Sequence, residues 1–187
     1  MIFVTVGTQL PFDRMISTID AWAAENKRTD VFAQVGPATY RPTHIQYSEF
    51  LPADACRQKI EQASVVIAHA GMGSIITALE LGKPIIVMPR RSELGEHRNN
   101  HQISTAKKFL EQGTIHVAMD EQELLQRLLS IDTIESRGKV SNTASPQLLN
   151  ALRDFVQRGK LPGRVIISAP ASSHATGDLR PAGQTYR

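Results

Sequence analysis

The sequence predicts an α/β protein built on one doubly wound parallel sheet, and three observations support this fold class. Short apolar runs rich in β-branched residues alternate with segments of helical periodicity. Val65–Ala68 and Ile85–Met88 carry no charge, as expected of strands covered by helices on both faces. Alternation on this scale is typical of parallel strands joined by right-handed crossovers.

The expected elements follow from the local pattern. The β-branched run at the N-terminus indicates a strand, and Pro11 suits the first turn of the helix after it. Gly82-Lys83-Pro84 ends another helix. In chain order we expect a strand at Ile2–Val6, a helix at Pro11–Asn26, strands at Val31–Val35 and His44–Phe50, a helix at Pro52–Ala63, a strand at Ser64–His69, a helix at Ser74–Leu81, a strand at Pro84–Met88, a helix at His101–Gln112, a strand at Thr114–Met119 and a helix at Glu121–Ser130.

The C-terminal part of the chain reads differently. After a polar connector at 131–144, Ser145 and Pro146 begin a helix that extends to Gln157 and carries an apolar stripe. This helix either packs on its own domain or docks a partner chain. Residues 159–187 are rich in Gly, Pro, Ser and Ala without periodicity, which predicts a disordered tail. We therefore expect one domain at residues 1–158 and a tail at 159–187.

Composition excludes several classes of protein. The net charge of +3 arises in residues 159–187, since the charges of residues 1–158 balance, so the core shows no basic patch for nucleic acid. No apolar run approaches the length of a membrane span, and the N-terminus lacks the basic region of a signal peptide. Cys56 is the only cysteine, which favours a reducing, cytoplasmic compartment.

One strand-to-helix junction, His69–Ser74, contains more glycine than a turn requires. Ligands of doubly wound sheets bind beyond the carboxyl ends of the strands, where Gly7–Gln9, this junction and the loop Arg90–Gln102 are expected to meet. Gly71, Gly73 and Ser74 stand where free N–H groups and the helix dipole favour a phosphate. The alternative is a purely structural role, in which the glycines form a tight turn and Ser74 caps the helix. We favour a phosphate site.

The order of motifs resembles a known family. His69-Ala70-Gly71-Met72-Gly73-Ser74, then Gly82-Lys83-Pro84, Pro89 and Asn100-His101-Gln102, resemble the donor-binding half of GT-B glycosyltransferases. The chain is most similar to the glycosyltransferase family 28 C-terminal domain, over residues 1–158. Within that family it resembles stand-alone subunits of bipartite enzymes, both the dolichol-linked N-acetylglucosaminyltransferase and bacterial exopolysaccharide or capsule enzymes. VTVGTQLPFDRMI and PRR…LGEHRNNHQ are most like the bacterial group.

The resemblance implies a Rossmann-like sheet that forms the donor half of a GT-B fold. It implies a UDP-linked sugar as donor, inversion at the anomeric carbon and no cofactor. The matched positions imply that Gly71, Gly73 and Ser74 face the diphosphate with His69 near it, that Phe50 and Leu51 line the uracil, that Asn100, His101 and Gln102 contact sugar hydroxyls, and that Gly7 and Thr8 lie near the reacting centre.

One position departs from the family pattern. A glutamate on the helix after the junction holds the ribose in the wider family, and Thr77 stands there in this chain. Glu80 lies one turn further along the same helix face. Either Thr77 makes a weaker contact, or Glu80 substitutes, or Glu80 pairs with a neighbouring cation and leaves the ribose to other groups.

Charged residues of the loop Arg90–Gln102 raise two further possibilities. Arg90 and Arg91 would be solvated charges, or would offset the diphosphate, or would hold a donor carboxylate by a bidentate contact. Arg90, Arg91 and His97-Arg98 crowd a loop that is expected to face the hexose, and the bacterial relatives include glucuronosyltransferases. We therefore favour UDP-glucuronate over UDP-N-acetylglucosamine or UDP-galactose. His97 and His101 flank one helical turn beside Glu96, but a third ligand is not evident and we expect no metal.

The resemblance also implies a partner. Only a donor half fits within the chain, so we expect the catalytic base and the acceptor site to come from a membrane-anchored subunit. The acceptor would be a polyprenyl-diphosphate saccharide, reached at the cytoplasmic face. The catalytic residues of this chain itself remain unassigned. The alternatives are a non-catalytic UDP-sugar-binding regulatory module and a dehydrogenase, but the first turn lacks the G-x-G-x-x-G dinucleotide fingerprint.

Overall fold

The computed structural model describes residues 1–140 together with Asn150 and Arg153. The chain divides into two units, Met1–Asn142 and Thr143–Arg187. The helix expected at 145–157 and the tail expected at 159–187 fall, apart from those two residues, outside the described part of the chain. The fold and the site described below belong to the first unit.

Within the described residues, six parallel strands form one sheet in the order β3-β2-β1-β4-β5-β6. The strands are β1 (Ile2–Thr5), β2 (Val31–Gln34), β3 (Gln46–Ser48), β4 (Val65–His69), β5 (Ile85–Met88) and β6 (His116–Val117). From β1 the chain builds outward to β3, then returns to place β4 on the other side of β1. The carboxyl ends of β1 and β4 therefore flank a topological switch point, where doubly wound sheets bind their ligands.

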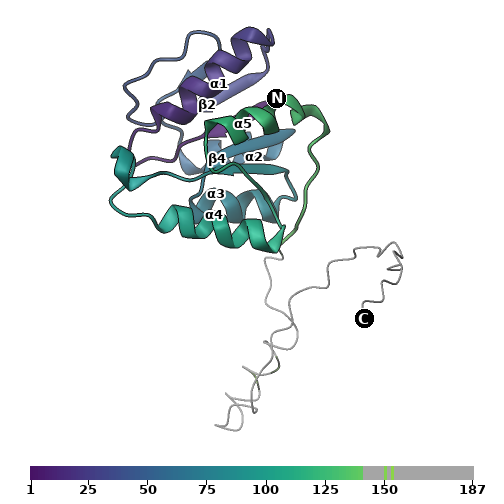
Figure 1. Cartoon of the computed structure of the whole chain (residues 1–187). Helices are drawn as coiled ribbons and strands as arrows, with labels where there is room; N and C mark the ends of the chain where they lie inside the picture. The colour runs from purple at the N-terminus through teal and green to yellow at the C-terminus, as the bar shows by residue number, and fades with distance from the viewer. Residues whose placement is uncertain (141–149, 151–152, 154–187) are drawn as a thin grey trace, which may run out of the picture. The chain divides into compact units, whose positions relative to one another are not determined.

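Helices cover both faces of the sheet (Figure 1). They are α1 (Asp13–Glu25), α2 (Ala53–Gln62), α3 (Met72–Glu80), α4 (His101–Gln112) and α5 (Glu121–Leu129), with short 3-10 turns at Ser92–Leu94 and Ile131–Thr133. One buried cluster contains Met15 of α1 and Leu124 of α5, and a second contains Ile60, Ile75 and Ala106 of α2, α3 and α4. Burial on both faces explains why the central strands lack charge, and it confirms the predicted fold class.

Most element boundaries differ from the expectation by one or two residues, and two of these differences have a clear physical cause. The third strand covers only Gln46–Ser48, because the N–H groups of His44 and Ile45 donate to the carboxylate of Asp20 at 2.9 and 3.0 Å instead of to a strand. Asp20 is 1% exposed. Burial alone would raise the pKa of Asp20, but the hydrogen bonds from Thr43 and His44 outweigh it and lower that pKa. This buried carboxylate fixes the approach to β3 against α1.

The second difference lies at the ligand-facing edge. Helix α3 begins at Met72 with Gly71 as its N-cap, two residues before the expected start. Ser74 therefore sits inside the first turn and is not the capping residue. Its main-chain N–H, with those of Met72 and Gly73, belongs to the group that has no partner within the helix.

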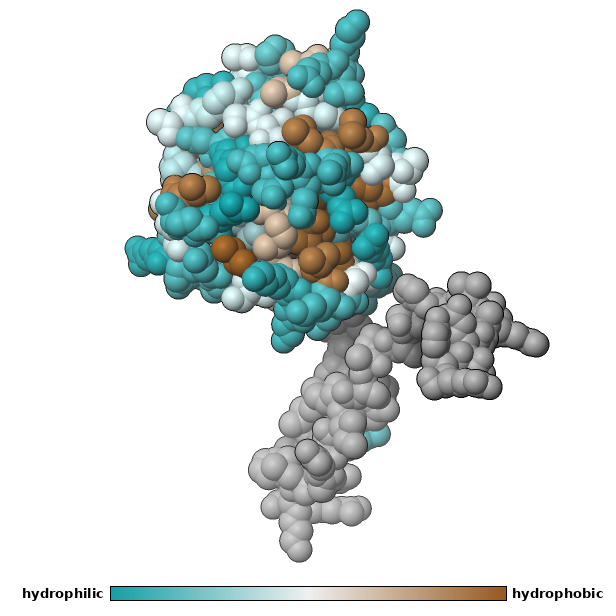
Figure 2. Space-filling model, viewed as in Figure 1, coloured by the Kyte–Doolittle hydropathy of each residue, from teal (hydrophilic) through white to brown (hydrophobic). Residues whose placement is uncertain are grey.

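The surface mixes polar and apolar residues. Hydrophobic residues form separate small patches among hydrophilic ones on the face shown in Figure 2. Scattered patches of this kind are ordinary on folded proteins. Among the described residues, none of the helices combines the length and the apolar character needed to cross a bilayer.

Candidate functional site

A pocket of about 810 Å³ opens at the carboxyl edge of the sheet. Its walls come from the end of β2, from the segments that follow β1, β3, β4 and β5, and from α2. The lining residues are Thr5–Leu10, Gln34, Phe50, Leu51, Ala53, Asp54, Cys56, Arg57, Ile60, His69, Gly71, Gly73, Ser74, Thr77, Arg90, His97, His101 and Gln102. The three segments expected to meet from the sequence, Gly7–Gln9, His69–Ser74 and Arg90–Gln102, do meet here.

His69 is packed between two glycines at the floor of the pocket. A Cβ built on Gly71 would lie 2.2 Å from Nε2 of His69, and one on Gly7 would lie 2.8 Å from its Cε1. Gly7 also has a positive φ of 76°, which glycine adopts without strain. The fold therefore requires both glycines in order to seat the imidazole ring.

Burial controls the charge of this histidine. Burial, with a smaller contribution from the charge of Arg90, lowers the pKa of His69 to about 4. The ring is neutral at neutral pH. Its Nδ1 is buried and has no hydrogen-bond partner within the described residues.

The first turn of α3 forms a second wall, and it is open. A Cβ on Gly73 would meet nothing within 4 Å, so the protein itself does not require a glycine there. No side chain caps the helix. The N–H groups of the first turn, together with the positive end of the helix dipole, favour an anion at this wall.

Thr77 and Glu80, the two candidates for the ribose, are placed differently. Thr77 lines the pocket, and its hydroxyl donates to the main-chain oxygen of Gly73 at 2.9 Å. Glu80 is not among the lining residues and lies 3.4 Å from Nη1 of Arg57. The ion pair that the sequence left as one of three possibilities is therefore present.

Helix α2 contributes residues that the sequence analysis did not single out. Phe50 and Leu51 line the pocket, and Asp54 and Arg57, in the first and second turns of α2, extend the same wall. Gln34, at the carboxyl end of β2, also lines the pocket, and its Nε2 donates to the main-chain oxygen of Gly7. The rule that places ligands beyond strand ends would have found Gln34. Asp54 and Arg57 could not be found in this way, because they reach the pocket through the packing of α2 against α3.

The two arginines of the loop after β5 differ from the expectation. Arg90 lines the pocket but is only 2% exposed, and its guanidinium donates to the main-chain oxygens of Val6, Leu10, Pro11 and Glu96. Arg91 is not among the lining residues and donates to the main-chain oxygen of Met119 at 2.9 Å. Arg91 therefore lies outside the pocket. The guanidinium of Arg90 has no pair of free N–H groups that could bind a carboxylate. A bidentate carboxylate clamp is not formed by this arrangement.

The residues matched to sugar recognition, Asn100–Gln102, do not all line the pocket. His101 and Gln102 line the pocket, and Oε1 of Gln102 accepts the main-chain N–H of Arg90 at 3.2 Å. Asn100 does not line it. Its Oδ1 accepts hydrogen bonds from the main-chain N–H and the hydroxyl of Ser92, so Asn100 shapes the loop.

His97 and His101, the pair considered for a metal, pack edge to face with ring centroids 4.5 Å apart. Burial and the charge of neighbouring groups, including His101, lower the pKa of His97. Within the described residues, no cluster of three His, Cys, Asp or Glu side chains is arranged to hold a metal ion.

Comparison with known structures agrees with this architecture. An NMR structure of ALG13 superposes with a TM-score of 0.51 at 20% identity, covering 81% of this chain and 93% of that one. A putative UDP-N-acetylglucosamine 2-epimerase from Listeria monocytogenes gives 0.57 at 14% identity, covering 89% and 47%. A glycotransferase of kitacinnamycin gives 0.51 at 20% identity, covering 70% and 34%. The fold is the Rossmann-like half of a GT-B glycosyltransferase.

The family follows from the sequence match. The model of the glycosyltransferase family 28 C-terminal domain matches residues 1–158, and the chain belongs to that family. Human UDP-N-acetylglucosamine transferase subunit ALG13 is 32% identical over 122 residues, 60% of this chain and 10% of the human protein. The Saccharomyces cerevisiae protein of that name is 42% identical over 55 residues, 29% of this chain and 25% of the yeast protein. The chain thus spans about a tenth of the human relative.

Proposed function

We propose that the pocket binds a UDP-sugar and that the chain is the donor-binding subunit of an inverting glycosyltransferase. The observation that carries the proposal is the open first turn of α3, where Gly73 leaves space that no protein atom fills. A diphosphate accepts hydrogen bonds from free N–H groups at a helix N-terminus, and it needs close access to the backbone. Family membership supports the same ligand.

The diphosphate, the uracil and the sugar of the donor contact different walls of the pocket. The diphosphate lies on Gly71, Gly73 and Ser74 beside neutral His69, and the uracil lies against Phe50 and Leu51. The sugar extends toward Thr8, His101 and Gln102. Of the residues considered for the ribose, Thr77 is favoured because it lines the pocket while Glu80 pairs with Arg57. Asp54 adds a carboxylate on the facing wall.

The sugar we propose is N-acetylglucosamine. One of the two arguments for glucuronate is a carboxylate clamp formed by Arg90 and Arg91, but four N–H groups of the Arg90 guanidinium already donate to main-chain oxygens. The relatives are named UDP-N-acetylglucosamine transferase subunits. Titration of the chain with UDP-N-acetylglucosamine and with UDP-glucuronate tests the choice. Tighter binding of UDP-glucuronate would restore the carboxylate donor.

Transfer also requires a base that activates the acceptor hydroxyl and a site that holds the acceptor. We propose that a membrane-anchored partner supplies the catalytic base and the site for a polyprenyl-diphosphate saccharide, and recruits the chain to the cytoplasmic face. The word "subunit" in the names of the relatives supports a partner. Assembly of polysaccharide at the bacterial membrane, as in exopolysaccharide or capsule synthesis, is the setting we propose for this activity.

The second candidate is a regulatory module that binds a UDP-sugar without transferring it. Co-expression with the membrane-anchored partner separates the two functions. If the complex transfers labelled sugar to a polyprenyl-linked acceptor, the chain is an enzyme subunit. If the complex forms and binds the donor but transfers nothing to any acceptor, the regulatory function is correct.

A further inference from the structure

Arg90 is a buried cation that connects two loops of the pocket. Nη2 donates to the main-chain oxygens of Val6 and Leu10 at 2.6 and 2.7 Å. Nη1 donates to those of Pro11 and Glu96. These acceptors bracket the turn Gly7–Gln9 and reach the loop after β5. One side chain thus joins segments about eighty positions apart in sequence.

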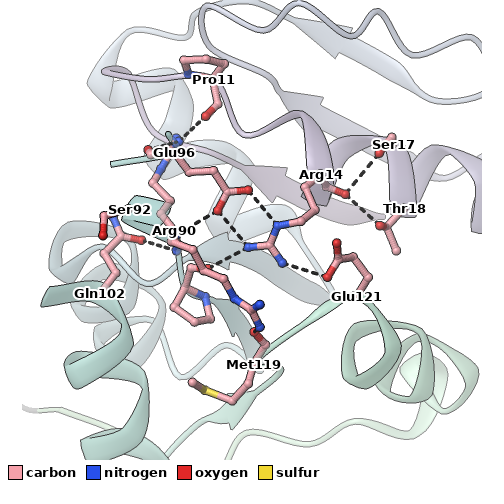
Figure 3. A network of polar contacts seen from close by, with 12 residues as sticks. Pro11, Arg14, Ser17, Thr18, Arg90, Ser92, Glu96, Gln102, Met119 and Glu121 are labelled. Carbon is pink, nitrogen blue, oxygen red and sulfur yellow. Dashed lines mark hydrogen bonds and ion pairs between the residues drawn. The ribbon is translucent and has the colours of Figure 1, made fainter. Parts of the chain in front are cut away.

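A second arginine, Arg14, contacts Glu96 as well (Figure 3). Arg14 forms a bidentate ion pair with Glu96, at 2.7 and 2.9 Å, and also contacts Glu121 of α5 at 2.9 Å. Both guanidinium groups lie near the ring of Phe12, with Cζ of Arg14 at 5.3 Å and Cζ of Arg90 at 4.8 Å from its centroid. Phe12 itself is fully buried.

The acceptors of Arg90 are carbonyl oxygens, since the carboxylate of Glu96 is bound by Arg14. Burial lowers the pKa of Arg90 to about 10, so the group is still charged at neutral pH. A guanidinium can satisfy several carbonyls at fixed angles, because its donors form a rigid planar fork, whereas a lysine ammonium is a compact point charge on a flexible stem.

Apart from Arg90, the turn is constrained mainly at Gly7, which packs against His69. Gly7 donates to Oγ1 of Thr5 and accepts from Gln34, while Thr8 and Gln9 are exposed. Fixing the backbone of a residue costs conformational entropy, so a ligand that had to order the turn would bind correspondingly more weakly.

We propose that Arg90 is a positioning residue of the donor site, which holds the turn Gly7–Gln9 in its binding geometry before the donor arrives. It acts through the turn and makes no contact with the diphosphate of the donor. The inference rests on the proposed function, because the pocket must bind a UDP-sugar for the turn to matter.

The test compares Arg90→Lys and Arg90→Met with the unaltered chain. Titration calorimetry well below the melting temperature gives the affinity for UDP-N-acetylglucosamine, and backbone ¹⁵N relaxation gives the order parameters of residues 7–10. We expect order parameters near 0.85 in the unaltered chain without donor, and below 0.6 in both variants. The affinity should fall about ten- to a hundredfold in both, since the lysine keeps the charge but not the fork.

Arg28→Lys is the matched control. Arg28 also binds through its fork, to Asp30 and Asp132, and stacks on Trp22 with Cζ 5.6 Å from the ring, but it does not line the pocket. This variant should lose stability and keep both the affinity and the order of residues 7–10. A loss of affinity equal to that of Arg90→Lys would overturn the proposal, because it would reflect general destabilisation.

Other outcomes are equally decisive. If Arg90→Lys binds as tightly as the unaltered chain while Arg90→Met does not, the charge acts directly and the positioning role is wrong. If both variants fail to fold, order parameters below 0.6 for residues 7–10 in the unaltered, donor-free chain still contradict it. If the unaltered chain binds no uridine nucleotide, the proposed function fails instead, and the order parameters alone then decide whether Arg90 fixes the turn.

Discussion

The imidazole of His69 occupies the space that a side chain on Gly71 would need, with Nε2 only 2.2 Å from the position of that Cβ. Gly73, two residues later, has open space at the same position. The two glycines of one short motif therefore have different surroundings. Gly71 accommodates a side chain of the protein, and Gly73 leaves room in the pocket.

Gly71→Ala should destabilise the fold. The added methyl group forces His69 out of its position, and such overpacking typically costs about 1–3 kcal/mol. Urea unfolding of Gly71→Ala, His69→Ala and the double variant measures the coupling. We expect the alanine at 71 to cost far less when His69 is already absent. Additive losses would show that the clash with His69 is not the cause.

Gly73→Ala should have the opposite effect on stability. Alanine is favoured over glycine in helices by up to about 1 kcal/mol, and the new methyl group meets no protein atom. The melting temperature of the free chain should therefore rise, while the affinity for UDP falls at least tenfold. Unchanged affinity for UDP in this variant would remove the diphosphate from the first turn of α3.

His69, Gly71 and Gly73 also show what could and could not be predicted from the sequence. The spacing of glycines after a buried strand located the pocket, because strand ends and helix starts are local features. The reason for each glycine was not local. The ring that excludes a Cβ at Gly71 also contacts Gly7, which follows β1, and only the register of β1 beside β4 brings them together.

The acidity of His69 predicts a pH dependence of stability. Its pKa is lowered to about 4 in the folded chain from an ordinary value of 6.5, so between these values the unfolded chain binds more protons. Stability should rise from pH 4 to pH 6.5, with a contribution of up to about 3 kcal/mol from this group, and be lost as the pH falls. Chemical denaturation across this range should show that the unfolding free energy of His69→Gln depends less steeply on pH than that of the unaltered chain. The same slope in both proteins would assign the effect to other histidines.

Glu96→Gln should destabilise the chain through Arg14. Both side chains of the pair are largely buried, at 13% and 9% exposure, and removing one partner leaves a poorly solvated charge. Breaking a buried pair costs about 3–5 kcal/mol, and we expect the lower end because Glu121 still contacts Arg14. Urea denaturation measures the change in unfolding free energy. A loss below about 1 kcal/mol would mean that the pair is solvated.

Arg90 and Glu96 illustrate where prediction from sequence fails. Charged residues in a loop are usually solvated or contact a ligand, and both alternatives were considered for Arg90. Three of its four acceptors are main-chain oxygens about eighty positions away, and no side-chain pattern encodes them. The shortened third strand has a similar origin, because the carboxylate of Asp20 on α1 takes the N–H groups of His44 and Ile45.

The most direct test of the account is binding of uridine nucleotides to the isolated chain. Thermal or chemical unfolding is followed with UDP, UDP-N-acetylglucosamine, ATP and NAD, with Gly73→Ala as the control. Ligand at 100 times its dissociation constant should add about 2.7 kcal/mol of stability, for the uridine ligands and the unaltered chain only. Stabilisation by NAD or ATP with none by any uridine nucleotide would contradict the assignment of this pocket to a UDP-sugar.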